Sequence, residues 1–303
     1  MKDLPIEKRI GVSTHFMPAT HGEDIWVAIS IAGELGFTGF EIVPSLDQGF
    51  IGFPHNAYNV GVDLWDMSDA ESGRLIKKLS EFEWVTVHSP HLGWNLASAN
   101  RHLRKLTWQY YDCCFELAAE LEAAAMTFHG GYETWGIVRP ASEIYEYNLE
   151  YAQHLMEKAK KANVPVGYEI TQNFECLKYV CHRLPGWGIN LDMGHAYMER
   201  KTDERYYKYF DEFGDRILEV HQNSVCHYWN GFIEHLAVNT NNTIDYQGTY
   251  ERLKSLNYKG PIVCEIGGLD IQQAMQNCQQ AKEMICGLWK GDLQLKNRWY
   301  NGK

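Results

Sequence analysis

A histidine or a carboxylic acid ends each of six successive short apolar segments of this sequence. These six residues are His88, His129, Glu169, Asp192, His221 and Glu265. Burying such groups without partners is costly, so a purely structural role for all six is disfavoured. Where two glutamates, an aspartate and a histidine converge, the three carboxylates repel one another unless a cation neutralises them. The residue types therefore predict a divalent metal centre.

The donor set also indicates which metal is bound. Carboxylate oxygens with one imidazole suit Mn²⁺, Mg²⁺ or Co²⁺ at least as well as Zn²⁺, which usually takes more histidine or cysteine. The eight cysteines include no C-x-x-C pair, which argues against a thiolate zinc site and against a disulfide framework. We expect Mn²⁺ first, with Mg²⁺, Co²⁺ and Zn²⁺ as alternatives.

The segments that carry these residues have the pattern of β-strands, and helical periodicity lies between them. Eight strands are predicted, at residues 9–13, 39–43, 84–88, 125–129, 166–169, 188–192, 217–221 and 262–265. Apolar residues at i, i+3, i+4 and i+7 predict helices over 103–121 and 144–159. Eight strand-helix units of about 38 residues are typical of a (β/α)8 TIM barrel, whose active site forms at the C-terminal strand ends.

The prediction is a single domain with additions to the barrel. No linker rich in Pro, Ser or Gly interrupts the pattern, so residues 1–303 are expected to form one α/β domain. The apolar tail, about 287–303, is expected to pack on the barrel or on a neighbouring subunit. Insertions at 44–73 and 222–248 exceed the usual loop length and are candidate lids. Glu41 lies within the second strand, where side-chain alternation can point it into the barrel mouth.

Four strand ends resemble the metal-binding strands of the xylose-isomerase-like TIM-barrel superfamily. They read VGYEI, NLDMGH, LEVH and IVCEI, and the resemblance covers nearly the whole chain. This superfamily contains ketose 3-epimerases, sugar isomerases, inosose-processing enzymes and endonuclease IV-like proteins. The resemblance implies a metal-dependent enzyme, closest in site pattern to ketose 3-epimerases, whose metal ligands are Glu169, Asp192, His221 and Glu265.

The same resemblance implies substrate-binding residues beside the metal. In the segment EITQNFE, Glu175 matches the epimerase glutamate that binds the terminal oxygens of a sugar. His195 matches a histidine that binds a substrate oxygen, and His227 stands where ketose 3-epimerases usually carry an arginine. A sugar-derived carbonyl compound other than a free ketose, such as a 3-oxo-glycoside or an inosose, therefore stays open. The remaining expected pocket residues are His88, His129 and Trp94.

The expected mechanism is proton transfer next to a carbonyl group. A metal that binds the carbonyl and a neighbouring hydroxyl stabilises the enediolate formed when the carbon-bound proton leaves. Glu169 and Glu265 lie on different strands, so one can remove the proton and the other can return it. Return of the proton gives epimerisation or isomerisation, whereas loss of a β-substituent gives elimination. The residues leave these three reactions open.

Two other functions also stay open. The segments VHSPHLGWNLAS and TFHGG resemble zinc-binding segments of endonuclease IV, and a multi-zinc phosphodiesterase site would add His195 and His235 to the six strand-end residues. Against this reading, the aspartate expected two residues before His235 is Ile233, with Glu234 only adjacent. The other function is a non-catalytic carbohydrate-binding or assembly subunit.

Composition limits the partners. The 303 residues carry 28 Lys+Arg and 39 Asp+Glu, a formal charge of −11, so no global positive field favours nucleic acid. The N-terminus has no apolar signal region and no window approaches the roughly 20 apolar residues of a membrane span, which predicts a cytoplasmic protein. The expected partner is a small sugar or sugar-derived substrate. The resemblance implies a homo-oligomer, and a hetero-partner subunit stays open.

Overall fold

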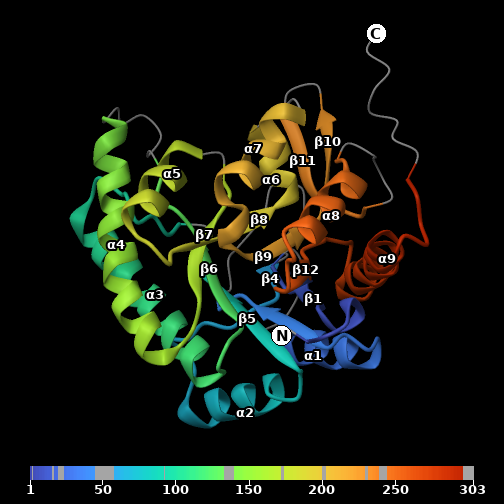
Figure 1. The fold of residues 1–303 in the computed structure, drawn as a ribbon. Coiled ribbons are helices and arrows are strands. Elements are labelled where there is room, and N and C mark those ends of the chain that lie inside the picture. The colour runs from blue at the N-terminus through green and yellow to red at the C-terminus, as the bar shows by residue number, and fades with distance from the viewer. Residues whose placement is uncertain are drawn as a thin grey trace.

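Eight parallel strands close into a barrel at the centre of the computed structural model (Figure 1). The structure describes residues 1, 3–15, 17–19, 24–44, 58–91, 93–132, 140–171, 174–199, 203–228, 231–238 and 244–295. In the order of their hydrogen bonding, the barrel strands are β1 (Ile10–Ser13), β3 (Gly39–Ile42), β5 (Trp84–His88), β6 (Ala125–His129), β7 (Val166–Glu169), β8 (Gly188–Asp192), β9 (Ile217–Gln222) and β12 (Ile262–Cys264). All neighbouring pairs are parallel, and β12 pairs with β1 to close the ring. The predicted (β/α)8 TIM barrel is confirmed.

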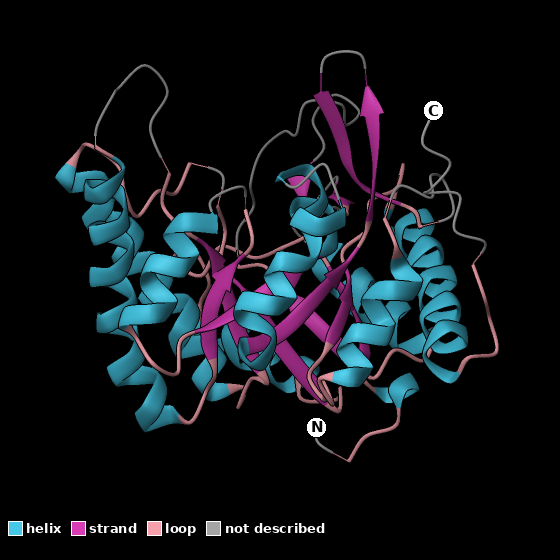
Figure 2. Ribbon diagram, turned by 45° about the horizontal axis from the view of Figure 1, so that its top comes forward, coloured by secondary structure: helices cyan, strands magenta, loops and turns pink. Residues whose placement is uncertain are grey.

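Helices surround this barrel (Figures 1 and 2). They are α1 (Asp24–Glu34), α2 (Asp69–Leu79), α3 (Arg101–Glu120), α4 (Ala141–Ala162), α5 (Phe174–Arg183), α6 (Met193–Glu199), α7 (Asp203–Phe213), α8 (Tyr246–Ser255) and α9 (Ile271–Lys290), with 3₁₀ turns at Ile6–Lys8 and Gly214–Arg216. The two predicted apolar stripes lie in α3 and α4, and α2 begins with a capping box between Ser68 and Glu71. None of the described helices is apolar enough over a sufficient length to cross a membrane.

Two short antiparallel sheets lie outside the barrel. One pairs β2 (Pro18–Ala19) with β4 (Tyr58–Asn59), and the other is a hairpin of β10 (Ser224–Tyr228) and β11 (Gly231–Leu236). Figure 2 shows this hairpin as the two magenta strands that rise above the barrel. The second candidate lid therefore contains a hairpin, whereas residues 45–57 of the first lie outside the described residues. A lid function stays a prediction for both.

The C-terminal region packs on the barrel as far as it is described. Helix α9 runs to Lys290, so the first residues of the predicted tail belong to a helix, which ends at Gly291 in the left-handed conformation. The ring of Trp289 lies against Arg9, whose guanidinium carbon is 4.6 Å from the ring centroid. Leu295 donates its backbone N–H to the side chain of Gln247. Residues 296–303 lie outside the described part of the chain.

Two glycines face each other closely in the barrel wall. Gly167 on β7 and Gly188 on β8 are register partners. A Cβ atom built on Gly167 would lie 2.3 Å from the backbone oxygen of Gly188, which cannot move without disturbing the strand. By contrast, Gly73 on the exposed face of α2 has no heavy atom within 4 Å of an added Cβ.

Replacing Gly167 with alanine is expected to lower the free energy of unfolding by about 2 kcal/mol or more, because the methyl group overlaps backbone atoms. The matched substitution Gly73→Ala should raise it by about 0.5–1 kcal/mol, because alanine is the better helix former. Urea denaturation of both variants measures these changes. Equal stability of the two variants would contradict the close approach of β7 and β8.

Candidate metal centre

The four predicted metal ligands lie together at the barrel mouth. Glu169 ends β7, Asp192 ends β8, His221 lies near the end of β9, and Glu265 directly follows β12. These four strands are consecutive in the barrel. One possible ligand atom from each residue lies within 4.8 Å of those of the other three, and each residue is at most 1% exposed. Three carboxylates and an imidazole at this spacing fit one divalent cation.

His221 is at the centre of this cluster. Its Nδ1 atom is 2.9 Å from Oε2 of Glu265 and 3.8 Å from both Oε1 of Glu169 and Oδ2 of Asp192. Burial opposes protonation of the ring, but the surrounding carboxylates, Glu265 first, raise the pKa of His221 well above its usual value. Burial alone raises the pKa of Glu169, yet nearby histidines, His129 first, hold that pKa well below its usual value. Protons on histidine and a bound cation are therefore two alternative ways to balance the same charges.

Two further predicted histidines lie on one side of Glu169. Nε2 of His88, at the end of β5, is 2.5 Å from Oε2 of Glu169, and Nε2 of His129, at the end of β6, is 3.2 Å from the same oxygen. Burial lowers the pKa of His88, but the hydrogen bond to Glu169 and the charges of Glu169, Glu41 and Glu265 together outweigh it and raise the pKa to about 9. Burial dominates at His129 and lowers its pKa to about 4. These three side chains form a second group that can hold a metal ion.

A third group lies on the other side of Glu169. Nδ1 of His195 is 2.9 Å from Oε1 of Glu169, and Nε2 of His195 is 3.3 Å from Oε2 of Glu234. His235, next to Glu234 on β11, completes a group whose ligand atoms lie within 4.8 Å of one another. Ile233 stands where an aspartate was expected, and the neighbouring Glu234 on the hairpin brings a carboxylate to this group instead. His195 also donates its backbone N–H to Oδ1 of Asp192 at 2.6 Å, which ties the start of α6 to the first group.

Several residues at the mouth were not predicted from the sequence. His15 follows β1 by two residues, and its Nδ1 is 2.5 Å from Oε1 of Glu265. His91 stacks on His129 with ring centroids 4.1 Å apart, and Asn223 donates to Oδ2 of Asp192 at 2.6 Å. The sequence did contain a signal for them, since each lies two or three residues after a strand-end residue or strand. These residues extend the mouth beyond the predicted set.

Two more acids lie deeper inside the barrel. Glu41, considered as a pocket residue from its alternation, is fully buried, with Oε2 3.1 Å from Nε2 of His221. Glu219 on β9 is also fully buried, and burial together with the charge of Glu41 raises its pKa to about 8. Both therefore lie on the far side of His221 from the four-ligand cluster.

The remaining predicted substrate residues are less closely associated with the cluster. Glu175 is exposed in the first turn of α5. Trp94 is half-buried in the loop after β5, where its ring stacks on Tyr110 at 4.5 Å and meets the edge of the half-exposed Trp65 at 5.8 Å. The backbone of His227 lies in β10, and its side chain is outside the described part of the structure. The substrate roles of these residues stay predictions.

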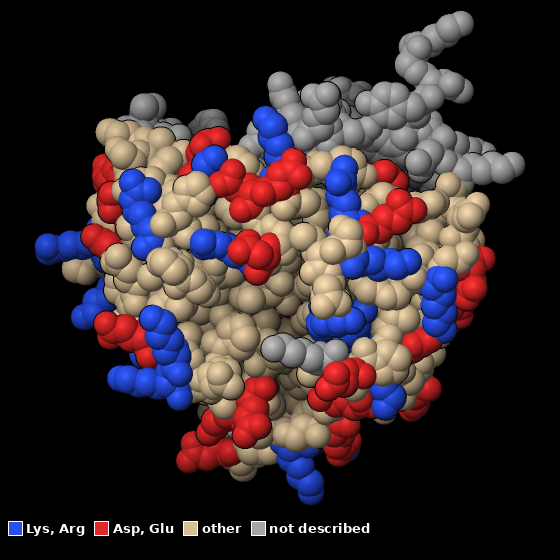
Figure 3. Space-filling model, viewed as in Figure 1, with Lys and Arg blue, Asp and Glu red and all other residues tan. Residues whose placement is uncertain are grey.

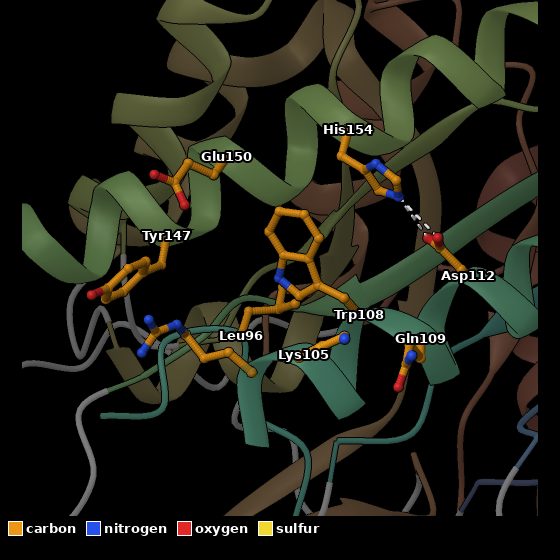
Figure 4. A pocket seen from close by; sticks show the side chains of 9 residues that line it. Leu96, Lys105, Trp108, Gln109, Asp112, Tyr147, Glu150 and His154 are labelled. Atoms are coloured by element: carbon orange, nitrogen blue, oxygen red, sulfur yellow. Dashed lines mark hydrogen bonds and ion pairs between the residues drawn. The ribbon is translucent and has the colours of Figure 1, made fainter. Parts of the chain in front are cut away.

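A separate hollow lies on the outside of the barrel, between α3 and α4 (Figure 4). Trp108 lines it and stacks on His154 with ring centroids 5.2 Å apart, and His154 binds Asp112 with Nε2 2.9 Å from Oδ2. His154 on α4 therefore contacts Asp112 and Trp108 of α3. This hollow contains none of the strand-end residues of the mouth.

Comparison with known proteins shows relatives of the same architecture. The family described as xylose isomerase-like TIM barrel matches residues 29–285. The uncharacterized protein MJ1311 of Methanocaldococcus jannaschii is 29% identical over 214 residues, which cover 66% of this chain and 70% of that protein. Two solved structures are also similar. A D-tagatose 3-epimerase-like protein has a TM-score of 0.69 and 23% identity, covering 94% of this chain and 100% of its own. The 3-keto-D-glucoside 4-epimerase YcjR of E. coli has a TM-score of 0.65 and 16% identity, covering 91% and 99%.

Metal affinity is expected to rise with pH between 7 and 9. The pKa of His88 is about 9, so its ring is positively charged at pH 7 and repels a cation next to Glu169. Each proton released on binding makes the affinity rise by up to about tenfold per pH unit below the pKa of its group, and His221, whose pKa is also raised, acts in the same direction. Titration calorimetry with Mn²⁺ measures the slope, and His88→Gln should reduce it. An unchanged slope in this variant would show that His88 is not the group that loses the proton.

Proposed function

Because the chain belongs to the xylose isomerase-like TIM barrel family, we propose that it is a divalent-metal-dependent enzyme that transfers a proton next to the carbonyl of a sugar or sugar-derived compound. The observation that supports this most is the buried cluster of Glu169, Asp192, His221 and Glu265. We assign Mn²⁺ as the first cation to test, because oxygen donors predominate in the cluster. The names of the two structural relatives, both of the epimerase type, agree with the proposed proton transfer next to a sugar carbonyl.

Two carboxylate-histidine pairs are suited to the proton transfers. Glu169 pairs with His88 and Glu265 pairs with His15, each at 2.5 Å. Glu169 ends β7 and Glu265 follows β12, and β8 and β9 lie between these two strands in the barrel, so the carboxylates approach a substrate from different directions. One glutamate removes the carbon-bound proton and the other delivers a proton to the opposite face. The paired histidine holds each carboxylate in place for this transfer.

The cation and the other mouth residues bind the substrate. A bound divalent cation would stabilise negative charge on the carbonyl oxygen as the proton leaves. His195 and His129 lie at the cluster and can donate hydrogen bonds to neighbouring hydroxyl groups, while Trp94 and Trp65 offer aromatic surface near the same strand ends. We propose epimerisation or isomerisation as the reaction, with elimination from a 3-oxo-glycoside or an inosose as the alternative.

Glu169→Gln and Glu265→Gln are each expected to lower turnover about 10²–10⁴-fold, because each removes one proton acceptor or donor. Deuterium incorporation from D₂O into candidate keto-sugars, measured by mass spectrometry and NMR, detects the transfer and distinguishes its products. Glu157→Gln, on the exposed face of α4, is the control that should keep full activity. Equal turnover in all three variants would rule out this proton transfer. A metal-loaded protein that turns over no candidate would favour a non-catalytic carbohydrate-binding subunit.

A second candidate function is hydrolysis of a phosphodiester at a site of several zinc ions. The observation that favours it is that two further ligand groups flank the four-ligand cluster, one with His88 and His129 and the other with His195, Glu234 and His235. Several adjacent cations can activate water and stabilise the leaving group. The surface offers less support, because acidic and basic side chains are interspersed over the described face in Figure 3.

Metal stoichiometry separates the two functions. Elemental analysis should find one Mn²⁺, Mg²⁺ or Co²⁺ per chain for sugar chemistry, whereas two or three Zn²⁺ per chain would support hydrolysis. Glu234→Gln is expected to leave a single-metal site intact and to remove about one zinc ion from a multinuclear site. Glu157→Gln again serves as the exposed control.

A further inference from the structure

A layer of polar side chains lies inside the barrel, next to the proposed metal ligands and closer to the N-terminal ends of the strands. Barrel interiors are ordinarily filled with branched apolar residues, so this layer is unusual. Four of its members come two residues before a mouth residue on the same strand, and side chains at i and i+2 face the same side. The fifth comes from β3, in register with β5. The members, all fully buried, are Glu41, Thr86, Thr127, Asn190 and Glu219.

His221 links this layer to the metal cluster, because its two ring nitrogens face opposite ways. Nδ1 faces the carboxylates of the cluster, 2.9 Å from Glu265. Nε2 faces the layer below, 3.1 Å from Oε2 of Glu41 and 2.8 Å from Nδ2 of Asn190. A neutral imidazole that gives its Nδ1 lone pair to a metal must carry its proton on Nε2. The neighbour of Nε2 therefore decides whether the ring is ready to bind a cation.

The two neighbours of Nε2 favour opposite tautomers. The amide nitrogen of Asn190 is a donor, so it favours an unprotonated Nε2, with the ring proton on Nδ1 and directed at Glu265. The carboxylate of Glu41 is an acceptor, so it favours a proton on Nε2 and a free lone pair on Nδ1. Glu219 belongs to the same layer but interacts with Thr127, whose hydroxyl donates to its Oε2 at 3.2 Å. Of the two acids, Glu41 is the one that contacts His221 through a hydrogen bond.

We propose that Glu41 is a positioning residue for the metal centre. Its carboxylate accepts the Nε2–H of His221 and so keeps the Nδ1 lone pair directed at the cation. This inference rests on the proposed metal centre and adds to it a residue from the opposite side of the barrel. A carboxylate behind a metal-binding histidine fixes the ring and increases its basicity, and its loss typically weakens metal binding 10–100-fold.

The arrangement also explains why an acid whose burial lowers stability, Glu41, lies in the barrel interior. Burying Glu41 beside Glu219 brings two carboxyl groups together in the barrel interior, where an apolar side chain would be cheaper. Replacing either acid with an apolar residue removes one buried carboxyl group, so a purely structural account predicts similar effects of the two replacements on the metal-free protein. Only a positioning role predicts that the two replacements differ in metal affinity.

The test compares Glu41→Met with the matched Glu219→Met, using Mn²⁺ alone as the probe. Titration calorimetry of metal-free protein should show affinity 10–100-fold weaker in Glu41→Met and within about threefold of wild type in Glu219→Met. Glu41→Gln, whose amide oxygen can still accept the Nε2–H, should bind at an intermediate affinity. Denaturation of the metal-free proteins provides the readout that a structural role would change.

Each other result overturns the proposal. Equal affinities of the two methionine variants, or a loss that follows their stability, would show that Glu41 does not act through His221. If Glu41→Met does not fold, Glu41→Gln against Glu219→Gln replaces the pair, with at least a several-fold difference expected. Failure of the wild-type protein to bind Mn²⁺ or Zn²⁺ would remove the metal centre and this role together. Normal wild-type binding with unaffected variants would remove the role of Glu41 alone.

Discussion

Charge balance around the buried ring of His221 is the constraint on which the rest of the mouth depends. Three carboxylates meet one imidazole nitrogen at a position that water does not reach. Unbalanced charges there would cost several kcal/mol each. The nearby histidines, including His88 and His195, provide that balance when protonated, and a divalent cation provides it when bound. Each of these side chains therefore depends on the others for its protonation state.

The closed barrel makes this charge balance possible, because it brings residues that are far apart in the sequence together at the C-terminal ends of the strands. Asp192 and His221 are register partners on neighbouring strands, and Glu265 follows a strand that also neighbours β9. The two-residue alternation along each strand then stacks a second polar layer beneath the first. The same geometry therefore determines both which atoms can hold a cation and which atoms hold those ligands from behind.

Much of this arrangement could be predicted from the sequence, for physical reasons that also explain what could not. The strands and the four-ligand cluster follow from apolar segments that end in His, Asp or Glu, because strand ends of a parallel barrel must converge. The convergence of strand ends does not determine where the residues of a hairpin lie, so Glu234 could not be placed near His195 from its sequence position alone. His15 and His91 lie beyond the strand ends, where loop conformation decides their direction. The exposed position of Glu175 depends on where α5 begins, which the motif around it does not determine.

The possible ligands of the site come from two separate structural elements, the closed barrel and the β10–β11 hairpin. The four-ligand cluster is carried by strands of the closed ladder or by the residue directly after one, so it cannot be altered without altering the barrel itself. Glu234 and His235 are carried by a hairpin that stands outside that ladder. Changes in the length or sequence of this hairpin can therefore add or remove a group of possible ligands while the four-ligand cluster persists. Chains with this barrel can in this way diverge in the number of ions they could hold while their scaffold remains the same.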